Sequence, residues 1–199
     1  ENDYDIKCIV ETSEFTAIPL EHDNKTDYKP FHRLCFPNGN TNTEIVANRL
    51  NAQGLTVLFP VEKALYEQIQ KLGDVTYYSS LSILLGLMTS KPVEENRYML
   101  AFFQGDIAMY ISMQDGKLQL TNAFRSESGQ DCIYYLLSIW KEQGFSQEED
   151  TLYLCGDTGV EANIMTIGRF IKSCRRLNAN ALFPSTLLNN MEGIPFDLQ

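Results

Sequence analysis

The chain has 199 residues, of which 44% are hydrophobic and 21% charged, and it carries a formal net charge of −10. The hydrophobic and charged fractions are ordinary for a globular protein that buries its own core. The acidic balance and the lack of a basic stripe argue against a nucleic-acid partner bound through its phosphates. No apolar run is long enough to cross a membrane, so we expect no membrane partner.

Residues that often carry chemistry are scattered. The cysteines are odd in number and mostly embedded in apolar patterns, which indicates reduced thiols in a cytoplasmic protein. They are Cys8, Cys35, Cys132, Cys155 and Cys174. The two histidines, His22 and His32, lie in a polar segment and lack the spacing of zinc ligands. We expect them to be solvated loop side chains, and we expect no metal site.

The first half begins with strand-like segments. Ile6 to Val10 and Phe15 to Pro19 have the composition of strands. Glu21 to Asn42 is polar and is interrupted by proline and glycine, so we predict a loop or a small insertion there.

Helical and strand patterns then alternate. Thr43 to Asn51 is predicted to be a helix, and Gly54 is predicted to end it before a strand over Leu55 to Phe59. Another helix is predicted over Val61 to Leu72, with an apolar face of Val61, Leu65, Ile69 and Leu72 at helical spacing. The same half ends with a predicted strand near Val75 to Tyr78 and a predicted helix from Ser80 to about Met88.

The second half has the clearest pattern. Strands are predicted over Tyr98 to Phe103, Asp106 to Gln114 and Lys117 to Asn122. Asp115-Gly116 is typical of a tight hairpin, so these strands form an antiparallel meander. In the middle strand Ile107, Met109, Ile111 and Met113 face one way, and Ala108, Tyr110, Ser112 and Gln114 face the other.

Strand and helix alternate after the meander. Asp131 is predicted to cap a helix that continues to Gln143 and stops at Gly144. The apolar face of this helix consists of Ile133, Leu136, Leu137 and Trp140. A strand over Thr151 to Cys155 leads into the turn Gly156-Asp157-Thr158-Gly159. A capping-box pattern at Thr158 predicts a further helix, with Ala162, Met165 and Ile171 facing inward.

The polar stretch Lys91 to Asn96 reads as a linker between two lobes. We predict a mixed α/β (α+β) chain with a first lobe over residues 1–92 and a second over residues 97–199. Because the chain opens on Glu1, we expect a fragment or a renumbered sequence.

Several segments together resemble an uncharacterised family of Bacteroidetes proteins, the domain of unknown function DUF3822. They are Phe15 to Pro19, Val57 to Val61, Leu120 to Phe124, Asp131 to Trp140 and Leu152 to Gly156. The resemblance covers nearly the whole chain. It implies a two-lobed actin-like ATPase fold of the ribonuclease H-like type, and it implies no established activity.

Proteins of that fold hold ATP phosphates between two glycine-bearing hairpins, with an aspartate that positions Mg²⁺ through water. In this sequence apolar or aromatic residues replace the expected strand aspartate, and only Gly105 and Asp106 remain at the corresponding turn of the second lobe. Asp106 is either a metal-facing carboxylate or ordinary turn chemistry. The hairpin of the first lobe should precede Ile6, so we expect it upstream of Glu1 or missing.

A second candidate site is the turn where such folds hold adenosine. Gly156, Asp157 and Gly159 follow an apolar strand and precede a helix, which suits either a nucleotide contact or a generic strand-to-helix junction. The preferred hypothesis is a cytoplasmic binding or scaffold module with a degenerate phosphate site, no catalytic residues, no cofactor and a protein partner. The alternative is an ATP/Mg-binding protein that acts as a weak ATPase or nucleotide switch.

Overall fold

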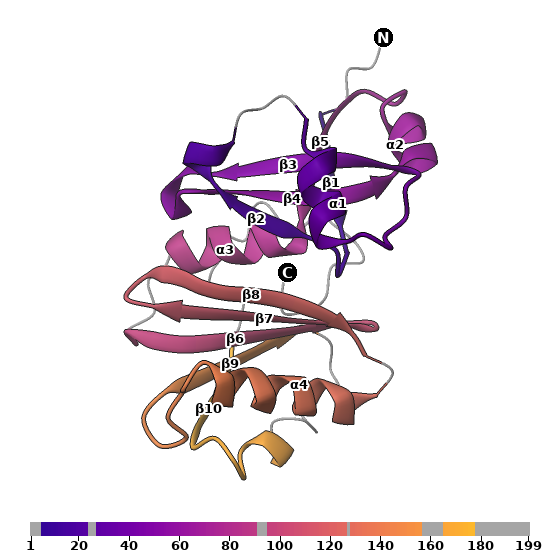
Figure 1. Ribbon diagram of the computed structural model, residues 1–199. Helices are drawn as coiled ribbons and strands as arrows, with labels where there is room; N and C mark the ends of the chain where they lie inside the picture. Colours follow the sequence, from indigo (N-terminus) through magenta and orange to yellow (C-terminus); the bar gives the residue numbers. More distant parts are fainter. Residues whose placement is uncertain (1–4, 24–26, 91–94, 127, 157–164, 178–199) are drawn as a thin grey trace. The chain divides into compact units, whose positions relative to one another are not determined.

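The computed structural model describes residues 5–23, 27–90, 95–126, 128–156 and 165–177. Contacts between Cα atoms divide the chain into two compact units, Glu1–Thr89 and Ser90–Gln199. Each unit combines strands and helices (Figure 1). Within the described ranges, no helix is long and apolar enough to cross a membrane.

The first unit contains two small sheets. β1 (Asp5–Val10) pairs in parallel with β5 (Asp74–Ser79). β4 (Leu55–Glu62) is the middle strand of an antiparallel sheet, between β2 (Thr16–Pro19) and β3 (Thr43–Leu50). An asparagine of β3 joins the two sheets, because the Asn48 side chain donates to the Tyr77 carbonyl at 2.7 Å and accepts from the Ser79 amide at 3.0 Å.

Short helices complete the first unit. They are η1 (Leu20–His22), α1 (Lys29–Cys35), η2 (Asn51–Gln53), α2 (Lys63–Ile69) and α3 (Ser80–Ser90). A proline in the first turn of α1 costs no helical hydrogen bond there. At the start of α3 the Ser79 hydroxyl accepts a hydrogen bond from the Ser82 amide at 3.1 Å, so it acts as a cap.

The helix predicted over Thr43 to Asn51 is wrong, because this segment is strand β3. Its residues pair with β4 along the whole strand, from Thr43 beside Glu62 to Leu50 beside Leu55. The local pattern was compatible with both structures, and pairing with the buried β4 decides between them. Gly54 does end a helical turn, with φ +67°, but that turn is η2, between two antiparallel strands.

The helix predicted from Val61 begins later, at Lys63. Val61 is a buried residue of β4, whereas Leu65 and Leu72 are exposed, so the predicted apolar face is wrong. Pro60 does not end β4, because β2 pairs only as far as Leu58 and leaves that side of Pro60 without a neighbouring strand. The polar segment Glu21 to Asn42 contains α1 as well as loop.

The second unit has the predicted order of elements as far as β9, whereas the last strand, over Ser173–Arg176, was not predicted. β6 (Arg97–Gln104), β7 (Ile107–Gln114) and β8 (Lys117–Arg125) form an antiparallel meander. After α4 (Gly129–Glu142), β9 (Thr151–Gly156) pairs in parallel with β6, and β10 (Ser173–Arg176) with β9. The sheet order is therefore β10-β9-β6-β7-β8, with α4 along one face (Figure 1).

The two hairpins of the meander use different turns. Gly105 has φ +56° while Asp106 keeps a negative φ, which is the type II′ pattern with glycine first. Asp115 and Gly116 both have positive φ, 51° and 72°, which is the type I′ pattern predicted from the Asp-Gly dipeptide.

The core of the second unit lies between α4 and one face of the sheet. Leu136, Ile139 and Trp140 of α4 are buried there, and Ile133 and Leu137 pack against them, which confirms the predicted apolar face. The sheet contributes Met99, Ala101, Phe103, Ala108, Tyr110, Leu152 and Leu154. The residues Ile107, Met109, Ile111 and Met113 point to the other face and are also buried.

Two details of the predicted helices differ from the structure. Ser128, and not Asp131, is the cap of α4, since its hydroxyl accepts the Asp131 amide at 3.3 Å and donates to the Asp131 carboxylate at 2.8 Å. In the later segment Ile171 is buried as predicted, but Met165 is 78% exposed. Ala162 lies outside the described residues.

The central strands β6 and β9 approach each other closely at Gly156. Gly156 lies beside Phe103 in the parallel ladder and has φ +103°. A Cβ atom there would lie 1.9 Å from the Phe103 carbonyl oxygen. Only glycine fits this position without movement of the backbone.

We therefore expect Gly156→Ala to lower the free energy of unfolding by about 3 to 5 kcal/mol, because a clash with backbone adds to the strain of positive φ. Gly116→Ala is the matched control. Gly116 also has positive φ, but nothing lies within 4 Å of its added Cβ, so only the conformational cost of about 1 to 2 kcal/mol should appear. Urea unfolding of the three proteins measures the difference, and equal losses in both variants would contradict the clash.

Candidate functional site

The candidate residues of the second unit lie at one edge of its sheet. β6 and β9 are parallel, and β8 runs in the same direction because both β6 and β8 are antiparallel to β7. Their carboxyl ends therefore meet, and the turn Gly105-Asp106 lies close to Gly156 through the pairing of Phe103 with Gly156. Asp157 and Gly159 lie outside the described residues.

Asp106 is held by a neighbouring strand end. Its carboxylate Oδ2 accepts a hydrogen bond from Arg125 Nη1 at 2.7 Å, and its carbonyl accepts the Ser126 amide at 2.7 Å. Both side chains are more than half exposed, so this ion pair contributes little stability. In the described ranges, no three His, Cys, Asp or Glu side chains gather in a way that could hold a metal ion.

The two phenylalanines before the turn are core residues. Phe103 packs in the cluster under α4, at 6.3 Å between ring centroids from Tyr110, and Phe102 is buried on the other face. Gly156 is required by the carbonyl of Phe103. The described residues at this end of the strands therefore have structural roles: Gly105 and Asp106 form the turn, Gly156 permits the strand pairing, and Phe102 and Phe103 belong to the core.

The start of α4 lies at the same edge. Ser126, whose amide bonds the Asp106 carbonyl, donates its hydroxyl to the Ser128 carbonyl at 2.7 Å, and its hydroxyl oxygen lies 3.0 Å from the Cys132 sulfur. Ser128 in turn caps the helix. This end of the helix therefore already has local partners for several of its polar groups.

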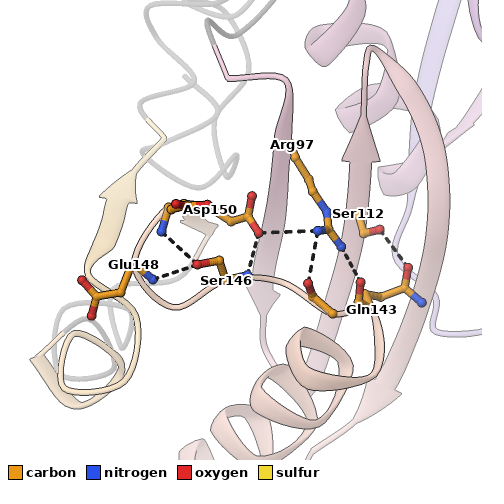
Figure 2. A network of polar contacts seen from close by, with 8 residues as sticks. Arg97, Ser112, Gln143, Ser146, Glu148 and Asp150 are labelled. Atoms are coloured by element: carbon orange, nitrogen blue, oxygen red, sulfur yellow. Dashed lines mark hydrogen bonds and ion pairs between the residues drawn. The ribbon is translucent and has the colours of Figure 1, made fainter.

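The richest polar network of the second unit lies at the opposite end of the sheet, around Arg97 (Figure 2). The guanidinium donates to the carbonyls of Gln143 and Gly144, the latter at 3.1 Å, and its centre lies 4.5 Å from the Phe145 ring centroid. A cation that bonds the last carbonyls of a helix satisfies groups that have no partner within the helix.

The helix end itself is a Schellman motif. The Gly144 amide bonds the Lys141 carbonyl and the Phe145 amide bonds the Trp140 carbonyl, each at 3.0 Å, with Gly144 at φ +66°. The hydrophobic contact of this motif is the stacking of Trp140 on Phe145, with centroids 4.6 Å apart. Gly144 is thus the predicted stop.

The same arginine reaches the loop before β9. Asp150 Oδ2 lies 3.8 Å from Arg97 Nη1 and accepts the Ser146 amide at 2.6 Å. The Ser146 hydroxyl accepts the amides of Glu148 and Glu149 at 3.3 and 3.2 Å (Figure 2). This network fixes a turn between helix and strand and contains no nucleophile with an adjacent base. The sequence does not point to this network, because an arginine just before a strand does not identify its partners.

We expect Arg97→Ala to lower the free energy of unfolding by about 2 to 3 kcal/mol, because it leaves the helix-end carbonyls without their charged donor. Arg97→Lys should recover only part of the loss, since an ammonium has no planar fork. Arg125→Ala removes an exposed ion pair and should change stability by less than about 1 kcal/mol. Chemical denaturation tests this, and a loss in Arg125→Ala as large as in Arg97→Ala would contradict it.

The first unit holds a buried carboxylate, Asp23. It accepts hydrogen bonds from the Tyr28 hydroxyl at 2.7 Å, Arg49 Nε at 2.6 Å and the Thr56 hydroxyl at 2.8 Å. Burial, followed by the bond to Asp23, raises the pKa of Tyr28 to about 12. Asp23 follows directly after η1, Arg49 belongs to β3 and Thr56 belongs to β4, so these hydrogen bonds join the three elements.

The prediction that His32 is a solvated loop residue is wrong. His32 belongs to α1 and is 5% exposed, with its ring 4.9 Å from that of Phe36. Burial lowers its pKa below 6.5, and the Glu14 carboxylate opposes this shift. The polar composition of the segment gave no sign that this side chain turns inward. His22 is exposed, as predicted.

The lowered pKa predicts a pH effect. As pH falls below about 6.5, the unfolded chain takes up a proton at His32 that the folded chain does not, so the free energy of unfolding should decrease. Chemical denaturation between pH 5 and 8 in a buffer without phosphate should show a steeper decline in the natural sequence than in His32→Gln. Parallel curves would contradict the assignment.

Comparison with solved structures defines the class of fold. A crystal structure of a Bacteroides thetaiotaomicron protein with an actin-like ATPase fold and unknown function matches at a TM-score of 0.75 and 24% identity, over 90% of this chain and 70% of that one. A type IV pilus biogenesis complex, PilM-PilN, matches at a TM-score of 0.51 and 9% identity, over 87% of this chain and 69% of that one. The protein has an actin-like ATPase fold of mixed α/β type, as predicted.

The family follows from the sequence match. The family described as a protein of unknown function (DUF3822) matches residues 3–174, and the chain belongs to it. The predicted resemblance is confirmed. No curated protein matches the chain.

Proposed function

We propose that the chain is a non-catalytic binding or scaffold module, built on an actin-like fold whose phosphate site is degenerate. The observation that carries the proposal is the ion pair between Asp106 and Arg125 at the turn where the fold would place a phosphate loop. A carboxylate that shares its charge with an arginine attracts hydrated Mg²⁺ less strongly than an unpaired one does.

The neighbouring residues support the same reading. Phe102 and Phe103 occupy the part of the strand where the fold would carry an aspartate, and both are core residues. The Phe103 carbonyl occupies the space that a side chain at Gly156 would fill, so the need for glycine there is explained without a ligand. These features favour a site that holds no ATP·Mg²⁺ group.

The partner of such a module is proposed to be another protein, because the net charge of −10 disfavours polyanions. The described cysteines are free thiols, which favours a reducing compartment such as the cytoplasm. The alternative, an ATP/Mg-binding switch, rests on the meeting of the Gly105-Asp106 turn with Gly156 at one strand edge. Asp157 and Gly159 would complete that site.

Thermal unfolding with millimolar Mg-ATP tests the proposal. We expect no change in Tm relative to magnesium chloride at the same ionic strength, and no phosphate release above buffer. A ligand present at about 100 times its Kd would stabilise the protein by about 2.7 kcal/mol, which is readily detected.

The matched variants are Asp106→Asn and Asp115→Asn, which change one aspartate at each end of β7. A saturable rise in Tm that Asp106→Asn abolishes and Asp115→Asn retains would overturn the proposal in favour of the nucleotide-binding alternative. Gly156 is unsuitable for this test, because its substitution disturbs the ladder itself.

A further inference from the structure

A small hollow in the first unit gathers hydrogen-bond donors. It is formed by α1, the loop after it and the start of β3, with a volume of about 40 Å³. Its polar lining residues are Lys29, His32, Arg33, Asn40, Thr41 and Thr43. None of its lining residues is acidic, in a protein with 26 acidic and 16 basic residues.

The two cations of the hollow have weak or no protein partners. Arg33 is exposed, and its guanidinium makes no hydrogen bond or ion pair with the described part of the chain. Lys29 Nζ lies 3.3 Å from Glu44 Oε2, in a pair with the lysine side chain 53% exposed. An exposed pair of this kind exchanges readily with a competing anion.

The imidazole of His32 adds a buried polar atom without a partner. Its Nε2 makes no hydrogen bond, and the nearest carboxylate oxygen, Glu14 Oε2, is 3.9 Å away, beyond hydrogen-bond distance. A buried polar atom left in this state costs free energy.

We propose that the hollow binds a phosphate group, with Arg33 and Lys29 as charged donors. A volume of about 40 Å³ holds about three water molecules, which is room for one tetrahedral oxyanion. Arg33 offers the planar fork that matches such an oxyanion. The carboxylates of Glu14 and Glu44 lie near and oppose the binding of an anion.

Titration with inorganic phosphate tests the proposal. The readout is the ¹H–¹⁵N spectrum of the full chain, recorded at pH 7.5 and constant ionic strength. We expect saturable shifts confined to α1, the loop after it and the start of β3. Arg33→Gln, an exposed change that should not disturb folding, is expected to weaken binding at least about tenfold. Arg125→Gln, the same change in the other unit, should leave it unaltered.

A second variant should act in the opposite direction. Glu44→Gln frees the Lys29 ammonium and should tighten phosphate binding several-fold, whereas Glu148→Gln, which frees the exposed Lys172 in the other unit, should not. Shifts that are linear, equal to those with chloride, or unchanged by Arg33→Gln would overturn the proposal. Acetate binding as tightly as phosphate would overturn the assignment to a phosphate group.

Discussion

The parallel pairing of β6 with β9 is the constraint on which the second unit depends. β6 is the middle strand of the sheet, so it pairs with the β7-β8 hairpin on one side and with the β9-β10 pair on the other. The pairing continues to Gly156 only because that residue has no side chain to meet the Phe103 carbonyl. A glycine that reads in sequence as part of a nucleotide turn is therefore first a requirement of the sheet.

The two ends of β6 have different chemistry. At its start, Arg97 bonds the last carbonyls of α4, lies over Phe145 and reaches Asp150, so one side chain orders a helix end and the next loop. At its other end, Asp106 is exposed and paired only with Arg125 in the described contacts. The end with dense polar contacts is structural, and the end where the fold family would place phosphate has few charged groups to offer.

The first unit shows how an acidic chain can still present a local positive surface. Lys29, His32 and Arg33 lie within a single short helix, and the loop after it adds amide and hydroxyl groups. The first unit also contains Asp23, whose buried carboxylate accepts hydrogen bonds from three donors. Burial thus removes one carboxylate from solvent while the exposed cations of α1 stay accessible, so net charge alone describes neither site.

Local patterns along the chain predicted the meander, its Asp-Gly hairpin, the apolar face of α4 and the glycine stop, because each depends on periodicity or on a residue with a fixed backbone preference. They also carried the family resemblance. That Thr43 to Leu50 is a strand depends on long-range pairing, since a partner strand supplies its hydrogen bonds. The burial of His32, the role of Arg97 and the contact between Gly156 and Phe103 likewise join residues whose proximity no local pattern encodes.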